Sequence, residues 1–290
     1  MGVDVKGTIV DDTQAEICSF ASSHLGMGSF VFVPQPARVY KANITYADGS
    51  TNTITLPKAI NLGYTLTINN TTADTIRLRV TAGSATVNEK LSLVAQSGGA
   101  VYYAAEKQSG SKMFTAVIPK SKFPTGVVQF TLFSEKGEPL NERLVFVNDN
   151  DQLKFNLAAP LKSYAPRQKV TLDLAAIAKA NKAATGSFSV AVVDETAVPA
   201  DSLNENSILS NLLLTSDLKG KVEQPNYYFI NQNEKTSEDL DLLMLTQGYR
   251  CFEWKKILDG TPAKLAYQPE KKMQLTGTVT RKNKPLEKAK

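Results

Sequence analysis

The chain has 290 residues, of which 42% are hydrophobic and 21% are charged, a composition typical of folded globular domains and not of disordered chains. The formal net charge of +5 is modest, and the basic C-terminal stretch lacks the interleaved aromatic residues of a nucleic-acid-binding surface. No apolar run approaches the roughly 20 residues that cross a bilayer. We therefore expect no nucleic-acid partner, and membrane association only through parts of a longer protein.

Short segments in the first half of the chain alternate apolar and polar residues with a period of two. In the clearest example, Tyr40, Ala42 and Ile44 point to one side of the chain, and Lys41 and Asn43 point to the other. Half-buried strands produce this pattern because successive side chains face core and solvent in turn. Similar runs lie at 3–10, 64–69, 76–80, 91–95, 101–105, 114–118, 128–133 and 144–147. Strands that follow one another so closely, with turn residues between them, indicate antiparallel sheets.

After residue 160 the pattern becomes mixed. Val170–Leu174 and Phe188–Val193 read as strands, whereas Leu203–Leu214 is long, apolar and poor in β-branched residues, which favours a helix. Ser237 precedes two acidic residues and a leucine-rich run, which predicts a helix that begins there and ends near Gly248. A second short helix is expected at about 253–258, and a new alternation begins at residue 273.

These elements predict a mainly β protein of tandem antiparallel β-sandwich modules, with one or two short helices appended to the third module. At this length, about two or three domains are expected. The predicted divisions are 1–83, a sandwich without its first strands; 84–152, a second sandwich; 153–270, a third sandwich with helices near 203–214 and 238–258; and 271–290, the start of a further sandwich. Because both ends of the chain fall within strand-like segments, we expect it to be a fragment.

The residues that usually carry catalysis or bind metals are scarce. His24 is the single histidine, and its Ser-Ser-His-Leu-Gly context indicates a surface loop. No histidine or cysteine pair has zinc spacing, and no glycine-rich loop has the form that binds phosphate. Asp194 and Glu195 are adjacent on an extended chain, so their carboxylates point apart. A role in forming a turn is therefore a better interpretation of this pair than a catalytic one. We therefore predict no enzyme activity, no cofactor and no metal site. We expect Cys18 and Cys251 to be free, partly buried thiols, and a disulfide between them is the alternative.

Aromatic residues gather in two places near the predicted helices. They are candidates for an interaction surface, since tyrosine and tryptophan anchor interfaces. The alternative, which we favour, is that they clamp the helices onto the third sandwich, because large exposed aromatic patches are uncommon. The six residues are Tyr227, Tyr228, Phe229, Tyr249, Phe252 and Trp254.

Several short sequence motifs resemble those of the macroglobulin domains of the alpha-2-macroglobulin and complement-like family. The first is His24-Leu-Gly-Met-Gly-Ser-Phe-Val-Phe-Val-Pro, followed by Tyr40-Lys-Ala-Asn-Ile, in which a Gly-x-Gly turn feeds a strand and a tyrosine begins its partner. Phe123-Pro-Thr-Gly-Val-Val and Glu142-Arg-Leu-Val-Phe-Val look like a second module, and Leu242-Leu-Met-Leu-Thr-Gln-Gly-Tyr-Arg is part of a third. Leu275-Thr-Gly-Thr-Val-Thr is similar to the opening of a carboxypeptidase-regulatory-like sandwich.

The resemblance implies a large envelope protein of Bacteroidetes-type bacteria, in which such modules precede a regulatory-like sandwich and often a TonB-dependent receptor plug. It implies a location in the bacterial periplasm or at the cell surface, associated with the outer membrane. The leading expectation is a non-catalytic binding or spacer region with a protein partner. A protease-inhibitor-like role is an alternative, for which 195–206 and 231–237 are the candidate bait loops, and a cryptic envelope hydrolase is another. The thioester motif Cys-Gly-Glu-Gln is absent, so covalent protease trapping is not expected.

Overall fold

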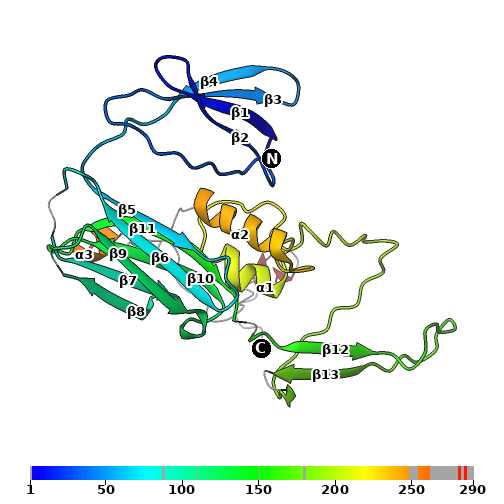
Figure 1. The fold of residues 1–290 in the computed structure, drawn as a ribbon. Helices are drawn as coiled ribbons and strands as arrows, with labels where there is room; N and C mark the ends of the chain where they lie inside the picture. The colour runs from blue at the N-terminus through cyan, green and yellow to red at the C-terminus, as the bar shows by residue number, and fades with distance from the viewer. Residues whose placement is uncertain are drawn as a thin grey trace. The chain divides into compact units, whose positions relative to one another are not determined.

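The computed structural model describes residues 2–86, 89–108, 110–149, 151–178, 181–247, 254–261, 280–281 and 284–285. Strands account for 37% of the chain and helices for 12%, which confirms the predicted mainly β class. The strands form antiparallel sheets with few helices (Figure 1). The chain divides into two compact units, Met1–Cys251 and Phe252–Lys290.

The first sheet contains β1 (Val5–Val10), β2 (Glu16–Ala21), β3 (Lys41–Tyr46) and β4 (Thr51–Thr55) in the order β2-β1-β3-β4. Ile9 of β1 lies opposite Cys18 of β2 and opposite Ala42 of β3, so these side chains share one face of the sheet. Ile9, Tyr40 and Ala42 form a small buried core, against which the free cysteine Cys18 is half-buried. At Gly7 the strands approach so closely that a Cβ would lie 2.1 Å from the Asn43 carbonyl oxygen.

The next strands form a β-sandwich around the largest core of the described chain. One sheet has the order β5-β6-β9 and the other β11-β10-β7-β8. The bounds are β5 (Tyr64–Asn69), β6 (Thr75–Ala82), β7 (Leu91–Ser97), β8 (Ala100–Lys107), β9 (Met113–Pro119), β10 (Gly126–Phe133) and β11 (Pro139–Val147), with a single 3-10 turn, η1 (Lys120–Lys122), before β10. The buried core residues come from both sheets: Ile68, Ile76, Leu78, Val80, Leu91, Leu93, Ala95, Ile118, Phe123, Val128, Phe130, Leu132, Val145 and Val147.

This shared core corrects the predicted boundary at 83–84. β6 pairs with β9 along its whole length, from Thr75↔Pro119 to Thr81↔Met113, so strands on both sides of residue 83 belong to one sandwich. The chain passes from β6 in one sheet to β7 in the other across this predicted boundary, and turn residues alone do not distinguish such a connection from a domain joint. The sandwich therefore begins at β5, after the connection that follows β4.

A helical layer covers the outer face of the β10–β11 pair. It consists of α1 (Ile208–Ser210), the π-helical turn η3 (Asn211–Thr215) and α2 (Glu234–Thr246). A second apolar cluster joins this layer to the sheet: Val127, Leu144, Phe146, Leu214, Leu218, Val222, Tyr228, Leu240, Leu243 and Met244. The helices therefore pack on the central sandwich, not on the third module as the sequence predicted. Val127 of β10 belongs to this cluster, and all residues of β10 are buried.

The two predicted helices exist, with different bounds. α2 begins after Asn233, whose side chain accepts a hydrogen bond from the Thr236 N–H in a capping box, four residues before the predicted cap at Ser237. The predicted helix at 203–214 is helical only from Ile208. Gly248, the predicted stop, lies outside the described residues. In the second unit, α3 (Trp254–Leu258) confirms the expected short helix.

The third predicted module contains one small sheet of β12 (Lys154–Ala158), β13 (Asp173–Ala178) and β14 (Lys182–Ala183), in that order. The predicted strand at Val170–Leu174 is paired only from Asp173 onward. Phe188–Val193 forms no strand, and Val192 is 86% exposed. Within the described part of 153–206, a closed sandwich core is absent: Ala176 is its single buried apolar residue. The second unit also holds β15 (Thr280–Arg281) and β16 (Lys284–Pro285), whereas residues 273–279, where a new alternation was predicted, are outside the described residues.

Candidate functional site

The segment 29–34 follows β2 through a tight turn. His24 and Met27 form an isolated antiparallel bridge, in which the Met27 N–H donates to the His24 carbonyl at 2.8 Å. Gly26 adopts φ +75° in this turn, a left-handed conformation that glycine accepts without steric cost. At Gly28 a Cβ would lie 2.4 Å from the Ala21 carbonyl oxygen. The Gly-x-Gly spacing noted in the sequence is thus required by the backbone of this turn.

Side chains of the 29–34 segment alternate between the first sheet and solvent. Phe30 and Phe32 face the same side, with ring centroids 6.1 Å apart, as residues two positions apart do in an extended chain. Phe30 packs on Phe20 of β2 at 5.5 Å, and Phe32 packs on Tyr40 at 5.0 Å. Val31 and Val33 point the other way, with exposed fractions of 92% and 90%. The segment therefore has the side-chain pattern of a strand in a second layer over the sheet.

The backbone of this segment lacks the pairing that its side chains predict. Among the residues that the structure describes, none forms a backbone hydrogen bond with positions 29–34. The connection to β3 is fixed immediately afterwards, because the Gln35 N–H donates to the Tyr40 hydroxyl at 2.8 Å. An extended apolar segment with open N–H and C=O groups is a template for an added strand. The edge strand β4 is a poorer template, since four of its five residues are threonine or asparagine.

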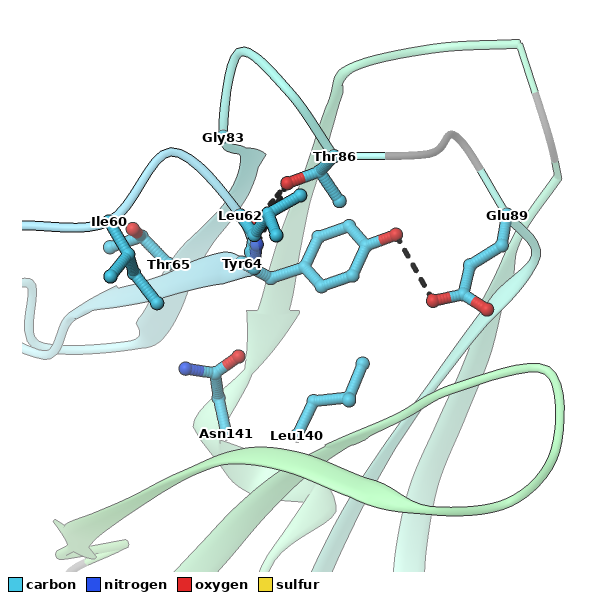
Figure 2. A pocket seen from close by; sticks show the side chains of 10 residues that line it. Ile60, Leu62, Tyr64, Thr65, Gly83, Thr86, Glu89, Leu140 and Asn141 are labelled. Carbon is cyan, nitrogen blue, oxygen red and sulfur yellow. Dashed lines mark hydrogen bonds between the residues drawn. The ribbon is translucent and has the colours of Figure 1, made fainter. Parts of the chain in front are cut away.

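A pocket of about 570 Å³ lies at the open side of the central sandwich, between β5 and β11. Figure 2 shows the Tyr64 ring between the loop that carries Thr86 and the β11 residues Leu140 and Asn141. The Tyr64 hydroxyl donates to the Glu89 carboxylate at 3.3 Å. Burial raises the pKa of Tyr64, and the Glu89 charge adds to this rise.

The predicted aromatic surface is divided by the structure. Tyr227, Tyr228 and Phe229 belong to the apolar cluster beneath α2, where Tyr228 is 2% exposed. Phe229 packs on Phe146 of β11 with ring centroids 5.8 Å apart. These three residues thus clamp the helical layer, as in the favoured alternative, but onto the central sandwich. Trp254 is half-buried in α3 of the second unit, and Tyr249 and Phe252 lie outside the described residues.

A buried polar cluster lies next to these tyrosines. The Asp239 carboxylate is fully buried, accepts a hydrogen bond from Tyr227 at 2.9 Å and contacts the Lys235 ammonium. His24 stacks on Tyr227 at 4.3 Å, and its Nδ1 is 3.9 Å from the same carboxylate. Burial lowers the pKa of His24, an effect that the Asp239 charge opposes. His24 is therefore not the surface-loop residue that the sequence predicted; its side chain is 13% exposed.

The other residues considered as catalytic candidates have structural roles. Asp194 accepts hydrogen bonds from the Thr196 N–H and hydroxyl, at 2.9 and 2.6 Å, which is turn chemistry as expected. Within the described part of the chain, no three His, Cys, Asp or Glu residues gather so that they could hold a metal ion. The same part contains no helix of the length and apolarity that a bilayer crossing requires.

No protein-family model and no curated protein matches the chain. Among solved structures, one similar protein is a tetra-tandem repeat in the extending region of a large adhesion protein, with 13% identity and a TM-score of 0.28. That match covers 64% of this chain and 58% of the other. A second is beta-glucuronidase 3 of Bacteroides uniformis, with 10% identity, a TM-score of 0.22, and coverage of 51% and 21%. The chain thus spans less than two thirds of either structure.

Proposed function

We propose that this chain is a non-catalytic binding region of a larger protein, which receives a β-strand of a protein partner at the 29–34 segment. The observation that carries the proposal is the unpaired backbone of this segment combined with its exposed valines. Val31 and Val33 are each at least 90% exposed, although valine at an alternating position usually packs within a sheet. An added strand would satisfy the open N–H and C=O groups and flank both side chains.

The alternation also indicates what kind of strand fits. Apolar side chains remain partly uncovered where the 29–34 segment meets the first sheet: Phe30 of the segment is 39% exposed, and Ile54 of β4, opposite Ala42, is 48% exposed. A strand beside the 29–34 segment would direct every second side chain toward the first sheet. We therefore expect a partner segment with apolar residues at alternate positions. Main-chain hydrogen bonds would supply affinity, and these alternate side chains would supply selectivity.

The wider setting is part of the same proposal. The sequence resemblance supports macroglobulin-like and immunoglobulin-like modules in an outer-membrane-associated, TonB-associated protein of the bacterial cell envelope. In that setting a chain of β modules serves either as a binding surface or as a spacer. The spacer version makes no use of the 29–34 segment, so an experiment on this segment distinguishes the two.

A library of displayed peptides of about ten residues, selected on the whole chain, tests strand addition directly. We expect the selected peptides to alternate apolar residues and to protect the amides of positions 30–33 from hydrogen exchange. Val31→Pro removes one donor and blocks pairing without touching Phe30 or Phe32. It should weaken peptide binding at least about tenfold, since several main-chain hydrogen bonds form together.

Val192→Pro is the matched control, because Val192 is also a highly exposed valine outside any strand. It should leave peptide binding unchanged. If Val31→Pro binds the selected peptides as well as the unaltered chain does, or if protection appears at β4 instead, strand addition at 29–34 is wrong. A chain that selects no alternating peptide would favour the spacer version.

A further inference from the structure

The pocket between β5 and β11 has a charge arrangement that selects one class of ligand. Its lining includes three exposed or partly exposed aliphatic side chains: Ile60 at 78%, Leu62 at 62% and Leu140 at 38%. Among the described residues that line it, Glu89 is the single charged one, and none is a lysine or an arginine. The volume of about 570 Å³ is within the range of small-molecule sites. The pocket thus combines an apolar wall with one carboxylate.

The Glu89 carboxylate is oriented by its neighbour. Tyr64 donates to one oxygen at 3.3 Å, and a carboxylate can accept further hydrogen bonds at its other oxygen. The Lys107 ammonium donates to the backbone carbonyl oxygens of Glu89 and Gln108, at 3.4 and 3.3 Å. Tyr64 thus holds one oxygen of a carboxylate that lines the pocket.

The lining also includes Tyr64 and the polar side chains of Thr65, Thr86 and Asn141. Its three exposed aliphatic side chains favour an alkyl chain through the hydrophobic effect. The carboxylate favours a cation at the end of that chain and disfavours an anion.

We propose that this pocket binds an aliphatic primary ammonium group, which is the chemistry of a lysine side chain. The alkyl part lies along Ile60, Leu62 and Leu140, and the ammonium group donates to Glu89. This site is separate from the 29–34 segment and does not depend on strand addition.

Three matched probes separate the contributions of charge and apolar contact: n-hexylamine, n-hexanol and hexanoate. Methyl resonances of Ile60, Leu62 and Leu140 are followed in the whole chain by NMR as each probe is titrated. We expect n-hexylamine to shift all three, n-hexanol to shift them with weaker affinity, and hexanoate to bind weakest. Glu89→Gln should weaken n-hexylamine about two- to fivefold, the range of a partly exposed ion pair, and leave n-hexanol unchanged.

Two controls keep the result interpretable. Glu106→Gln removes a different carboxylate, one that pairs with Lys90 at 2.9 Å outside this lining, and should change no probe. Leu140→Ala should weaken n-hexylamine and n-hexanol alike, because both lose the same apolar contact. The proposal is overturned if hexanoate binds as tightly as n-hexylamine, if Glu89→Gln leaves n-hexylamine unaffected, or if the probes shift methyl groups elsewhere.

Discussion

At the scale of single residues, His24 links the turn after β2 to the helical layer. The chain has one histidine, so a change in stability near its pKa can be assigned to this side chain. Burial favours the neutral form and lowers the pKa of His24 below 6.5. The Lys235 ammonium lowers this pKa further, whereas the Asp239 carboxylate raises it. The folded protein therefore binds a proton at His24 less readily than the unfolded chain does.

The sign of the pH dependence follows from this shift. Above pH 6.5 His24 is neutral in both states, and the stability is fully present. As the pH falls through 6.5 toward the lower folded pKa, the unfolded chain binds the proton first and the free energy of unfolding decreases. Urea denaturation at about pH 8 and about pH 5.5 measures the loss. His24→Gln should flatten it; an unchanged slope would show that other groups cause it.

At the scale of elements, one ion pair fixes α2 to β11. Both carboxylate oxygens of Asp241 lie 2.8 Å from one guanidinium nitrogen of Arg143, Nη2, and the Arg143 side chain is 11% exposed. A charge-assisted, partly buried pair of this kind is stronger than a fully exposed pair. Asp241→Asn should lower the free energy of unfolding by about 1–2 kcal/mol. Chemical denaturation measures this change.

The Lys90–Glu106 pair provides the comparison, because its two side chains are 40% and 54% exposed. Glu106→Gln should change stability by less than about 0.5 kcal/mol, since solvent screens an exposed pair. Equal losses in the two variants would contradict a special role for the Arg143–Asp241 pair in holding α2.

The elements also show where sequence patterns succeed. β6 alternates buried and exposed residues, from Ile76 to Val80, so its period of two was visible in the sequence. α2 was recognisable by its leucines, but its cap was misplaced because Ser237 and Asn233 are both good caps and the choice depends on the Thr236 hydroxyl. Phe188–Val193 has strand composition but forms no strand, because strand pairing is a long-range property that a local pattern does not contain.

The candidate sites were only partly accessible to sequence reasoning. The Gly-x-Gly turn and the residues Phe30 to Val33 stood out as a motif, but their unpaired state requires knowledge of every neighbouring strand. Glu89 and Tyr64 are 25 positions apart, and no spacing rule joins them to Leu140. Of the six predicted aromatic residues, Tyr227, Tyr228 and Phe229 gather beneath α2, and they pack on the central sandwich because the helices cross back over an earlier module.

At the scale of the whole molecule, the helical layer makes the central sandwich depend on residues far along the chain. Truncation at residue 152, the predicted module boundary, would uncover Val127, Leu144 and Phe146. Exposure of such side chains costs about 1.5–3 kcal/mol each. We expect a 1–152 chain to bind a hydrophobic dye and to aggregate in size-exclusion chromatography, whereas a 1–247 chain should remain monodisperse. A monodisperse 1–152 chain that binds no dye would contradict this dependence.

The complete burial of β10 has a consequence for how this chain can vary. A strand with one solvent-exposed face tolerates charged substitutions at every second position, and substitutions usually accumulate at such exposed positions first. β10 offers none of its eight positions to charged substitution, since all eight residues are buried. Divergent copies of this module should therefore keep apolar or uncharged polar residues throughout β10, even where the sequences of the neighbouring alternating strands have diverged.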